Sequence, residues 1–369
     1  MRRPRFGMVG DMAVEQSKAG GEAVGFSARG RAKFPTRMST ALKGLIGASP
    51  IPRFSTKMPG VSHAGPLPAL TEDQRDLSAE LRANVEELAG PLAGRNVFNP
   101  ARLRACEEFL SARLGECGRP VTRQEFDCRG QTVANFQVEF PGAERPGEIL
   151  VVGAHYDAVE LSRGLCPAAN DNGSGTAAVL ALARRFARRG AACGRTVRFV
   201  LWVNEEPPFF WTDLMGSLVY ARACRAKAEN IVGMITPETL GCYSEVEGSQ
   251  RYPLGLFKRW YPARGDFVAF LGMHEAAALV RRSVELFREH CRFPSIGVAL
   301  PAIIPHVGAS DHWSFWKCGY PALMVTDTAP YRYRWYHTED DTPDKMNFEC
   351  MARVVEGLAS VVETLANDR

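Results

Sequence analysis

The stretch TVRFVLWVNEE, residues 196–206, places two adjacent glutamates directly after a run of β-branched and aromatic residues. A short apolar run of this composition indicates a buried strand, here at residues 197–203. Two further strands are predicted at 148–157 and 230–238, and helices at 174–190 and 216–228 separate the three. Strands that alternate with helices need crossover connections, which give a largely parallel sheet covered on both faces.

The flanking segments extend this pattern. Helices are predicted at 70–90 and 99–118, with Thr71 and Asn99 as their N-terminal caps and Gly118 as the stop of the second helix. Residues 121–128 and 132–140 are typical of a β-hairpin, and 321–327 of a strand. We therefore expect an α/β fold, a three-layer αβα sandwich with a mixed, mostly parallel central sheet. Residues 67–369 are expected to form a single domain.

The first 66 residues differ in composition from the rest. They hold eleven Lys or Arg against three Asp or Glu, are rich in Gly, Ser and Pro, and lack the apolar core of a secretory signal. We expect this segment to be disordered. Its net charge is +8, whereas the whole chain has a net charge of +4, so residues 67–369 have a net charge of −4. Nucleic acid is therefore not an expected partner.

Two further absences bound the class of protein. No apolar run is long enough to span a bilayer. The ten cysteines show no CxxC spacing, which argues against a thiolate zinc site or a disulfide scaffold. With no signal segment visible, we expect a cytoplasmic protein with reduced thiols. The sequence makes no prediction of oligomeric state.

Histidines and carboxylates recur where the predicted strands end. Glu205 and Glu206 follow the strand at 197–203, and the other such residues are His155, Asp157, Asp171, Glu238 and His337. In parallel sheets, ligand groups gather beyond the carboxyl ends of the strands. We therefore expect these side chains to meet at the rim of one sheet edge, outside the core.

A cluster of carboxylates is costly when all are ionised, since like charges raise one another's pKa, and a divalent cation removes that cost. Two histidines and three acids without cysteine suit zinc or a similar metal, and two ions can share one carboxylate. Asp171 is the natural bridge by its place in the chain. Adjacency lets Glu206 ligate while Glu205 stays outside the coordination shell as a general base.

The segments HYD (155–157), ANDNGSG (169–175), NEE (204–206) with GS (216–217), PETLG (237–241) and YHTEDDTPDK (336–345) resemble, in this order and spacing, the M28 family of zinc-dependent aminopeptidases. The resemblance covers roughly residues 70–365. It implies one zinc ion held by His155, Asp171 and Glu238, and a second held by Asp171, Glu206 and His337. It also implies that Glu205 is the general base, that Asp157 supports the first histidine, and that Tyr336 polarises the scissile carbonyl.

The expected activity is hydrolysis of the first peptide bond of a peptide substrate by water activated between two zinc ions. Glutaminyl cyclases share this fold and much of the metal set, and are the alternative enzyme class. They typically have Trp before the last histidine, whereas this chain has Tyr336, which favours hydrolysis. A metal-free binding module of the same fold is a third hypothesis. It is disfavoured because a residue able to bind metal stands at every one of the five ligand positions.

The sequence leaves further candidates outside the resemblance. Four other histidines are interpreted as structural or surface residues: His274, His290, His306 and His312. Asp311 is evenly balanced between a site role and a helix cap. The aromatic residues of segment 207–215 are predicted to form a wall of the substrate pocket and to favour an apolar first residue, the alternative being that the rings pack inward.

Overall fold

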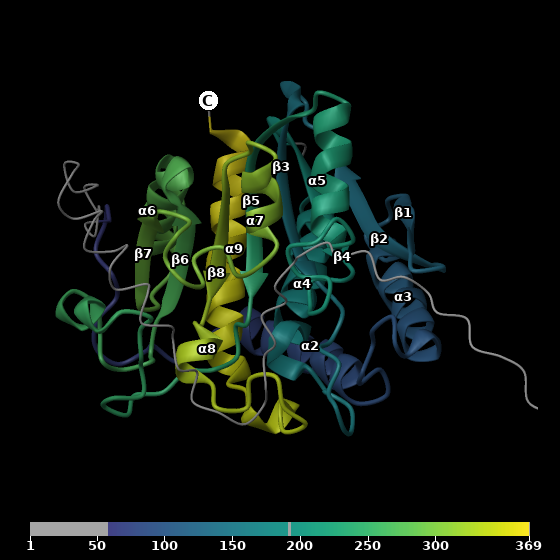
Figure 1. Ribbon diagram of the computed structural model, residues 1–369. Helices are drawn as coiled ribbons and strands as arrows, with labels where there is room; N and C mark the ends of the chain where they lie inside the picture. Colours follow the sequence, from purple (N-terminus) through teal and green to yellow (C-terminus); the bar gives the residue numbers. More distant parts are fainter. Residues whose placement is uncertain (1–57, 191–192, 369) are drawn as a thin grey trace, which may run out of the picture. The chain divides into compact units, whose positions relative to one another are not determined.

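The computed structural model describes residues 58–190 and 193–368 of the chain, and a sheet of eight strands lies at the centre of this part (Figure 1). The strands are β1 (Val121–Cys128), β2 (Gln131–Phe140), β3 (Arg145–His155), β4 (Arg195–Trp202), β5 (Asn230–Glu238), β6 (Val268–Met273), β7 (Ser295–Leu300) and β8 (Ala322–Thr326). Their order across the sheet is β1-β2-β4-β3-β5-β8-β6-β7.

Four consecutive strands at the middle of the sheet run parallel. β4, β3, β5 and β8 pair in this order, for example Val152 of β3 opposite Phe199 of β4. The β1–β2 hairpin pairs antiparallel to β4, and β6 pairs antiparallel to β8 and parallel to β7. The sheet is therefore mixed and mostly parallel, as predicted, and the carboxyl ends of its four central strands share one edge.

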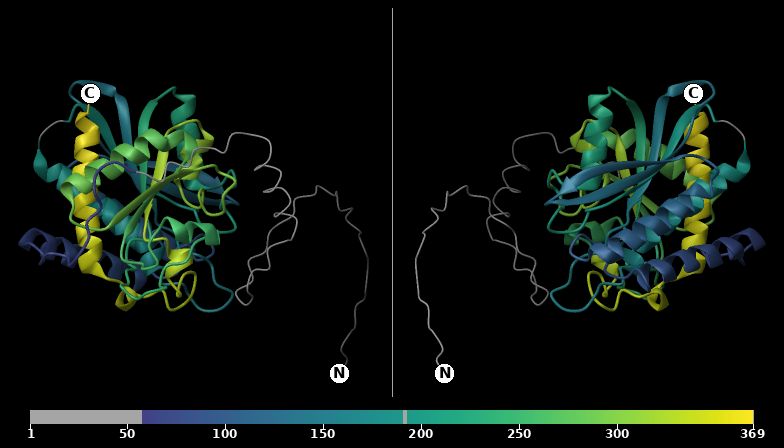
Figure 2. Two further views of the ribbon diagram at one scale, coloured as in Figure 1. Left: turned by 90° about the vertical axis from the view of Figure 1, so that its left-hand side faces the viewer. Right: turned by 90° about the vertical axis from the view of Figure 1, so that its right-hand side faces the viewer.

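Helices cover both faces of the sheet. The helices are α2 (Glu72–Ala89), α3 (Pro100–Gly115), α4 (Gly175–Arg189), α5 (Gly216–Ala226), α6 (Ala277–His290), α7 (His312–Lys317), α8 (Ala329–Arg332) and α9 (Phe348–Asn367). α2, α4 and α6 each pack against α9, and α5 packs against α7. The turned views show α9, in yellow, lying along one side of the sheet (Figure 2).

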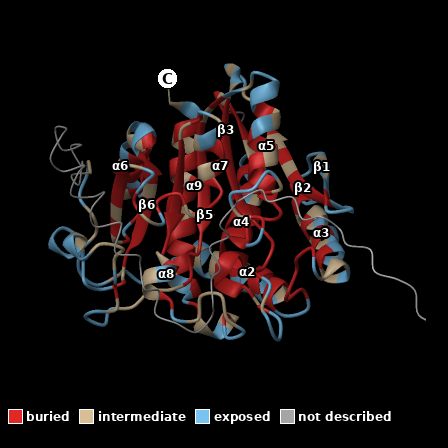
Figure 3. Ribbon diagram, viewed as in Figure 1, coloured by how far each residue is buried: buried red, intermediate tan, exposed pale blue. Residues whose placement is uncertain are grey.

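Successive side chains of the central strands point to opposite faces of the sheet and are buried in two separate hydrophobic cores. On β4, Phe199 and Leu201 join the core beneath α4 and α9, while Val200 and Trp202 join the core beneath α5 and α7. This two-sided burial explains why the strand at 197–203 is apolar throughout rather than alternating. The central strands are accordingly buried along most of their length (Figure 3).

Helix ends agree with the sequence signals in part. Thr71 forms a capping box with Gln74, as its position before α2 suggests. Asn99 precedes α3, but its side chain makes no capping hydrogen bond, and Pro100 occupies the first turn. α3 ends at Gly115, three residues before the predicted stop at Gly118.

Residues just before the predicted domain start contact the folded unit. Arg288 of α6 donates hydrogen bonds to the carbonyl oxygens of Met58, Pro59 and Gly60, and Ser62 Oγ accepts one from the Ser295 backbone at 2.9 Å. Residues 58–62 therefore bind the α6–β7 region, although the sequence placed them in a disordered arm. The rest of that prediction, for residues 1–57, lies outside the described residues. Among the described helices none is long and apolar enough to cross a membrane.

Candidate metal centre

The carboxyl edge of the four parallel strands carries the predicted residues. His155 and Glu238 are the last residues of β3 and β5, and Glu205 and Glu206 lie just beyond the end of β4. Asp171 comes from the turn Ala169–Ser174 that leads into α4, and His337 from the segment after α8. The structure thus brings together residues from five separate parts of the chain.

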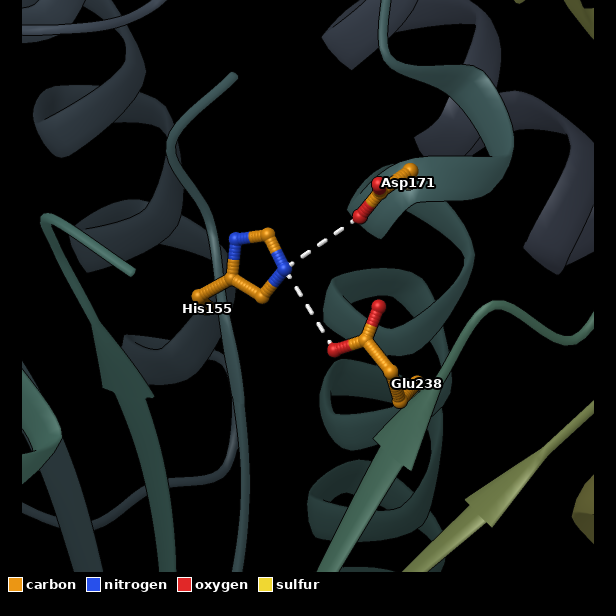
Figure 4. Close-up of side chains that lie close together, drawn as sticks. All are labelled: His155, Asp171 and Glu238. Atoms are coloured by element: carbon orange, nitrogen blue, oxygen red, sulfur yellow. Dashed lines mark ion pairs between the residues drawn. The ribbon is translucent and has the colours of Figure 1, made fainter. Parts of the chain in front are cut away.

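Two groups of three donors share one residue. His155, Asp171 and Glu238 form the first group, and Asp171, Glu206 and His337 form the second. Within each group the donor atoms lie within 4.8 Å of one another. Figure 4 shows the first group, with Glu238 at the tip of its strand and Asp171 on the facing turn, both directed at the imidazole.

The donor spacing within each group fits a bound cation. His155 Nε2 lies 3.4 Å from both Asp171 Oδ1 and Glu238 Oε2. His337 Nε2 lies 3.0 Å from Asp171 Oδ2 and 3.2 Å from Glu206 Oε2. Two ligands at zinc bond lengths and tetrahedral angles are about 3.4 Å apart. The two carboxylate oxygens of Asp171 face different histidines, as a bridging carboxylate requires.

Orphaned polar atoms support the same fit. His337 Nε2 and Glu206 Oε1 are buried and make no hydrogen bond, although the carboxylates of Asp171 and Glu206 lie close to His337 Nε2. Buried polar atoms are rarely left unpaired, so atoms that converge without bonding indicate a missing common partner. His337 also has a left-handed backbone with φ of 58°, a strained conformation that gathers at functional sites.

The charges of the cluster do not balance without a cation. Burial raises the pKa of Glu238 to about 8, and burial together with neighbouring acids raises the pKa of Glu205 and Glu206. Burial also acts on Asp171, but the two histidines close to its carboxylate outweigh it and hold the pKa of Asp171 below its usual value. Ionising all of these acids together is therefore unfavourable, and a bound divalent cation would make it favourable.

Glu205 and Glu206 were expected at the rim, and they are buried. Their exposed fractions are 7% and 3%. The reason is Asp157, whose carboxylate accepts backbone N–H bonds from Glu205 and Glu206, each at 3.1 Å, and so folds the chain after β4 back over the edge. Asp157 Oδ1 also lies 3.4 Å from His155 Nδ1, so one carboxylate supports both strand ends.

Glu205 stands beside the donor groups without belonging to either. Its Oε2 lies 3.9 Å from His155 Nε2, farther than any donor within the two groups that faces a histidine. The neighbouring Tyr336 stacks its ring on His337 with centroids 3.9 Å apart. Burial, with the charges of Asp171 and Glu206 adding to it, raises the pKa of Tyr336 well above 10 and keeps the phenol protonated.

Sequence reasoning gave no role to two residues that support the donors. Asp341 accepts hydrogen bonds from the backbone of Asn170 and Asp171 at 2.9 and 3.1 Å and from Tyr333 Oη at 2.7 Å. Ser310 Oγ donates to Glu238 Oε2 at 2.7 Å. Asp341 lies within the segment 336–345 that carries the resemblance, but only the folded chain shows what its carboxylate contacts.

Asp311 is not the helix cap that the sequence allowed. It precedes α7 but makes no capping bond, and both of its carboxylate oxygens are buried without a partner. Burial raises the pKa of Asp311 to about 6, with His155 opposing. The charge of Asp311 in turn contributes to the raised pKa of Glu205, so the two carboxylates influence each other's ionisation.

The four other histidines considered in the sequence analysis lie outside both donor groups. His274, His290 and His306 are exposed, and His312 is buried with its Nε2 at 2.6 Å from the Val307 carbonyl oxygen. Burial lowers the pKa of His312 to about 4, so this ring is neutral and structural. All ten cysteines are free.

An apolar cavity of about 90 Å³ opens beside Glu238 and Tyr336. Its lining comes from the segment before β6, from β6, β7 and β8, and from the segments that follow β7 and β8. It includes Tyr252, Phe257, Tyr261, Ile296, Val298 and Val307. The prediction that residues 207–215 form a wall is therefore wrong for this cavity. Phe209 is buried, and Trp211 is 56% exposed and donates a hydrogen bond from Nε1 to the Gly308 carbonyl oxygen.

Comparison with known proteins agrees with this architecture. Leupeptin-inactivating enzyme 1 of Streptomyces exfoliatus is 24% identical over 334 residues, covering 85% of this chain and 67% of that protein. The uncharacterized protein YfbL of Escherichia coli K12 is 32% identical over 299 residues, covering 80% and 90%.

Solved structures give the same fold at low identity. BSAP, a zinc aminopeptidase from Bacillus subtilis, superposes with a TM-score of 0.60 at 12% identity, covering 79% of this chain and 95% of that one. A glutaminyl cyclase of Fimbriiglobus ruber superposes with a TM-score of 0.56 at 20% identity, covering 83% and 99%.

The fold is the one that zinc aminopeptidases and glutaminyl cyclases share. Within that class, residues 135–362 match the sequence model of Peptidase family M28, and the chain belongs to this family. Membership of this peptidase family supports a hydrolase that acts on peptides.

Proposed function

We propose that this protein is a two-zinc aminopeptidase that removes an apolar residue from the amino terminus of peptides. The observation that carries the proposal is the pair of three-donor groups joined through Asp171, with Glu205 beside them and outside both. His155, Asp171 and Glu238 would hold one ion, and Asp171, Glu206 and His337 the other. Zinc supplies Lewis acidity that makes water acidic near neutral pH and polarises the peptide carbonyl.

The proton transfers fall to Glu205. Its buried carboxylate lies next to the donor groups without belonging to either, so it would accept a proton from water and then pass it to the leaving amine. The Asp157 bonds to the backbone of Glu205 and Glu206 fix the two side chains in their separate roles. Tyr336, whose ring stacks on His337, would donate a hydrogen bond to the oxyanion.

The apolar cavity supports the choice of substrate. It adjoins Glu238 and Tyr336, so a first residue whose carbonyl lies at the donor groups would direct its side chain into the cavity. Apolar walls with few polar groups favour leucyl, methionyl or phenylalanyl side chains over charged ones. We propose that the described unit, residues 58–368 with the gap at 191–192, forms a single catalytic domain.

A panel of substrates tests this function directly. Zinc-loaded protein is assayed on leucyl, alanyl, lysyl and N-terminal glutaminyl peptides, with amino acid release and ammonia release measured separately. We expect release of free leucine with a zinc content approaching two ions per chain. Ammonia release from the glutaminyl peptide without hydrolysis would favour the cyclase alternative, which the shared fold keeps as the rival.

A further inference from the structure

Arg95 is a fully buried cation next to the candidate metal centre. Its exposed fraction is 0%. Its guanidinium donates four hydrogen bonds, all to backbone carbonyl oxygens: Nε to Tyr156 at 2.6 Å, Nη1 to Leu88 at 2.7 Å and to Pro167 at 2.9 Å, and Nη2 to Ala168 at 2.9 Å. Among the described residues no carboxylate lies within 4.0 Å of it as an ion-pair partner.

A buried charge without a counter-ion is costly, so its partners must be held closely for the position to persist. A guanidinium suits this task because its donors are fixed in one plane and point in set directions. Four carbonyl oxygens from three parts of the chain therefore converge on one rigid group. Arg95 therefore links these three parts of the chain through one side chain.

Two of those parts lie beside two of the three donors of the first group, His155 and Asp171. Tyr156 lies between His155 and Asp157, and Ala168 precedes Asp171 by three residues with a left-handed φ of 51°. The neighbours of Arg95 extend the same bridge: Gly94 N donates to the Cys166 carbonyl oxygen, and Asn96 Nδ2 donates to that of Ala158. The segment 94–96 thus joins the chain after β3 to the turn that presents Asp171.

We propose that Arg95 is a positioning residue that sets the 3.4 Å separation of His155 Nε2 and Asp171 Oδ1, and thereby the affinity of the centre for its metal ions. Arg95 lies outside residues 135–362, the part that matches the family. The centre is then incomplete without the chain that precedes this part. The inference rests on the proposed function only in requiring that metal binds at these donors.

The test compares two variants with a matched control in the full-length protein. Arg95→Met removes the guanidinium, and Arg95→Lys keeps the charge but reaches fewer carbonyl oxygens. Arg353→Met is the control, because Arg353 of α9 is also buried, at 7% exposed, and also bonds a carbonyl oxygen, that of Pro68 at 2.6 Å. Zinc affinity is measured by competition with a chromophoric chelator, and cobalt(II) absorption reports the ligand geometry.

We expect Arg95→Met to weaken zinc binding by about 10–100-fold, as loss of an outer group that orients ligands does, and to alter the cobalt spectrum. Arg95→Lys should fall between this variant and the wild type, and Arg353→Met should melt lower yet bind zinc within about twofold of the wild type. If Arg95→Met does not fold, the Lys variant decides.

The outcomes separate this inference from the function. If a folded Arg95 variant binds zinc as tightly as the wild type, the positioning role is overturned and the peptidase proposal is unaffected. Equal weakening in Arg353→Met also overturns it, since the effect would then be general destabilisation. A wild-type chain that binds zinc but cleaves no peptide overturns the peptidase proposal alone, and one that binds no zinc overturns both.

Discussion

Replacing Glu205 by glutamine separates chemistry from metal binding. The amide keeps the size of the side chain and removes its capacity to take a proton. Glu205 belongs to neither donor group, and Asp157 holds it through its backbone N–H, a contact that the substitution does not touch. We therefore expect zinc affinity to change by less than about threefold, well under the loss typical of removing a group that orients a ligand.

Turnover should fall much further. Loss of a positioned acid–base group lowers rates by about 10²–10⁴, or about 2.7–5.5 kcal/mol of transition-state stabilisation. Stability should move in the opposite direction. Burial and the neighbouring acids raise the pKa of Glu205, so carrying this carboxylate destabilises the metal-free fold above pH 4.5, and glutamine removes that penalty.

Three measurements on one preparation check this reasoning. They are kcat on a leucyl substrate, zinc content after dialysis against a weak chelator, and the melting temperature in a strong chelator. Glu206→Gln serves as the contrast, because Glu206 Oε2 faces His337 within the second donor group. It should lose zinc by at least about 100-fold. Should both variants lose zinc alike, or should Glu205→Gln keep its turnover, the division of roles between the two glutamates is refuted.

Three other predictions follow from the same contacts. The melting temperature of the metal-free protein should fall as pH rises from about 5 to 8. Groups with a raised folded pKa, Glu238 at about 8 among them, contribute stability below their unfolded pKa and lose it as pH rises through the folded pKa. Bound zinc should flatten this dependence, and a melting temperature that does not change with pH in the presence of a chelator contradicts the reasoning. Asp341→Asn should cost about 1–3 kcal/mol in denaturant unfolding and weaken zinc binding, since an amide nitrogen would face a backbone N–H; unchanged zinc affinity would show that the Asp171 turn holds itself. Ile296→Trp, which fills the cavity, should reduce the leucyl-over-alanyl preference by about tenfold or more, whereas Trp211→Ala should leave it unchanged; the reverse result would restore residues 207–215 as the specificity wall.

The sequence predicted the centre because each donor follows a strand or turn that its own local pattern reveals. The apolar run before Glu205, and the turn residues around Asp171, mark these positions without any knowledge of distant contacts. Since parallel strands end at one edge, the meeting of His155 and Glu238 also follows. Periodicity and the edge rule together were sufficient for this part of the site.

Other features depend on contacts between segments that lie far apart and show no periodicity. The cavity is built from irregular chain around Tyr252 and Val307, so aromatic content near Glu206 misdirected the prediction to residues 207–215. Asp311 has the local appearance of a helix cap, and only its burial beside His155 shows otherwise. Arg95 lies in a short loop between α2 and α3, where an arginine is ordinarily exposed.

Most of the cavity lining comes from elements that carry no donor. The donors lie at the ends of β3, β4 and β5, in the Asp171 turn and after α8, whereas the cavity is shaped largely by β6, β7, β8 and the loops beside them, toward one margin of the sheet, with Glu238 common to both. Mutations can therefore accumulate at the margin and redirect the enzyme to new substrates while the catalytic strands stay as they are. This separation makes the scaffold evolvable, because selection can change what is cleaved without rebuilding how cleavage occurs.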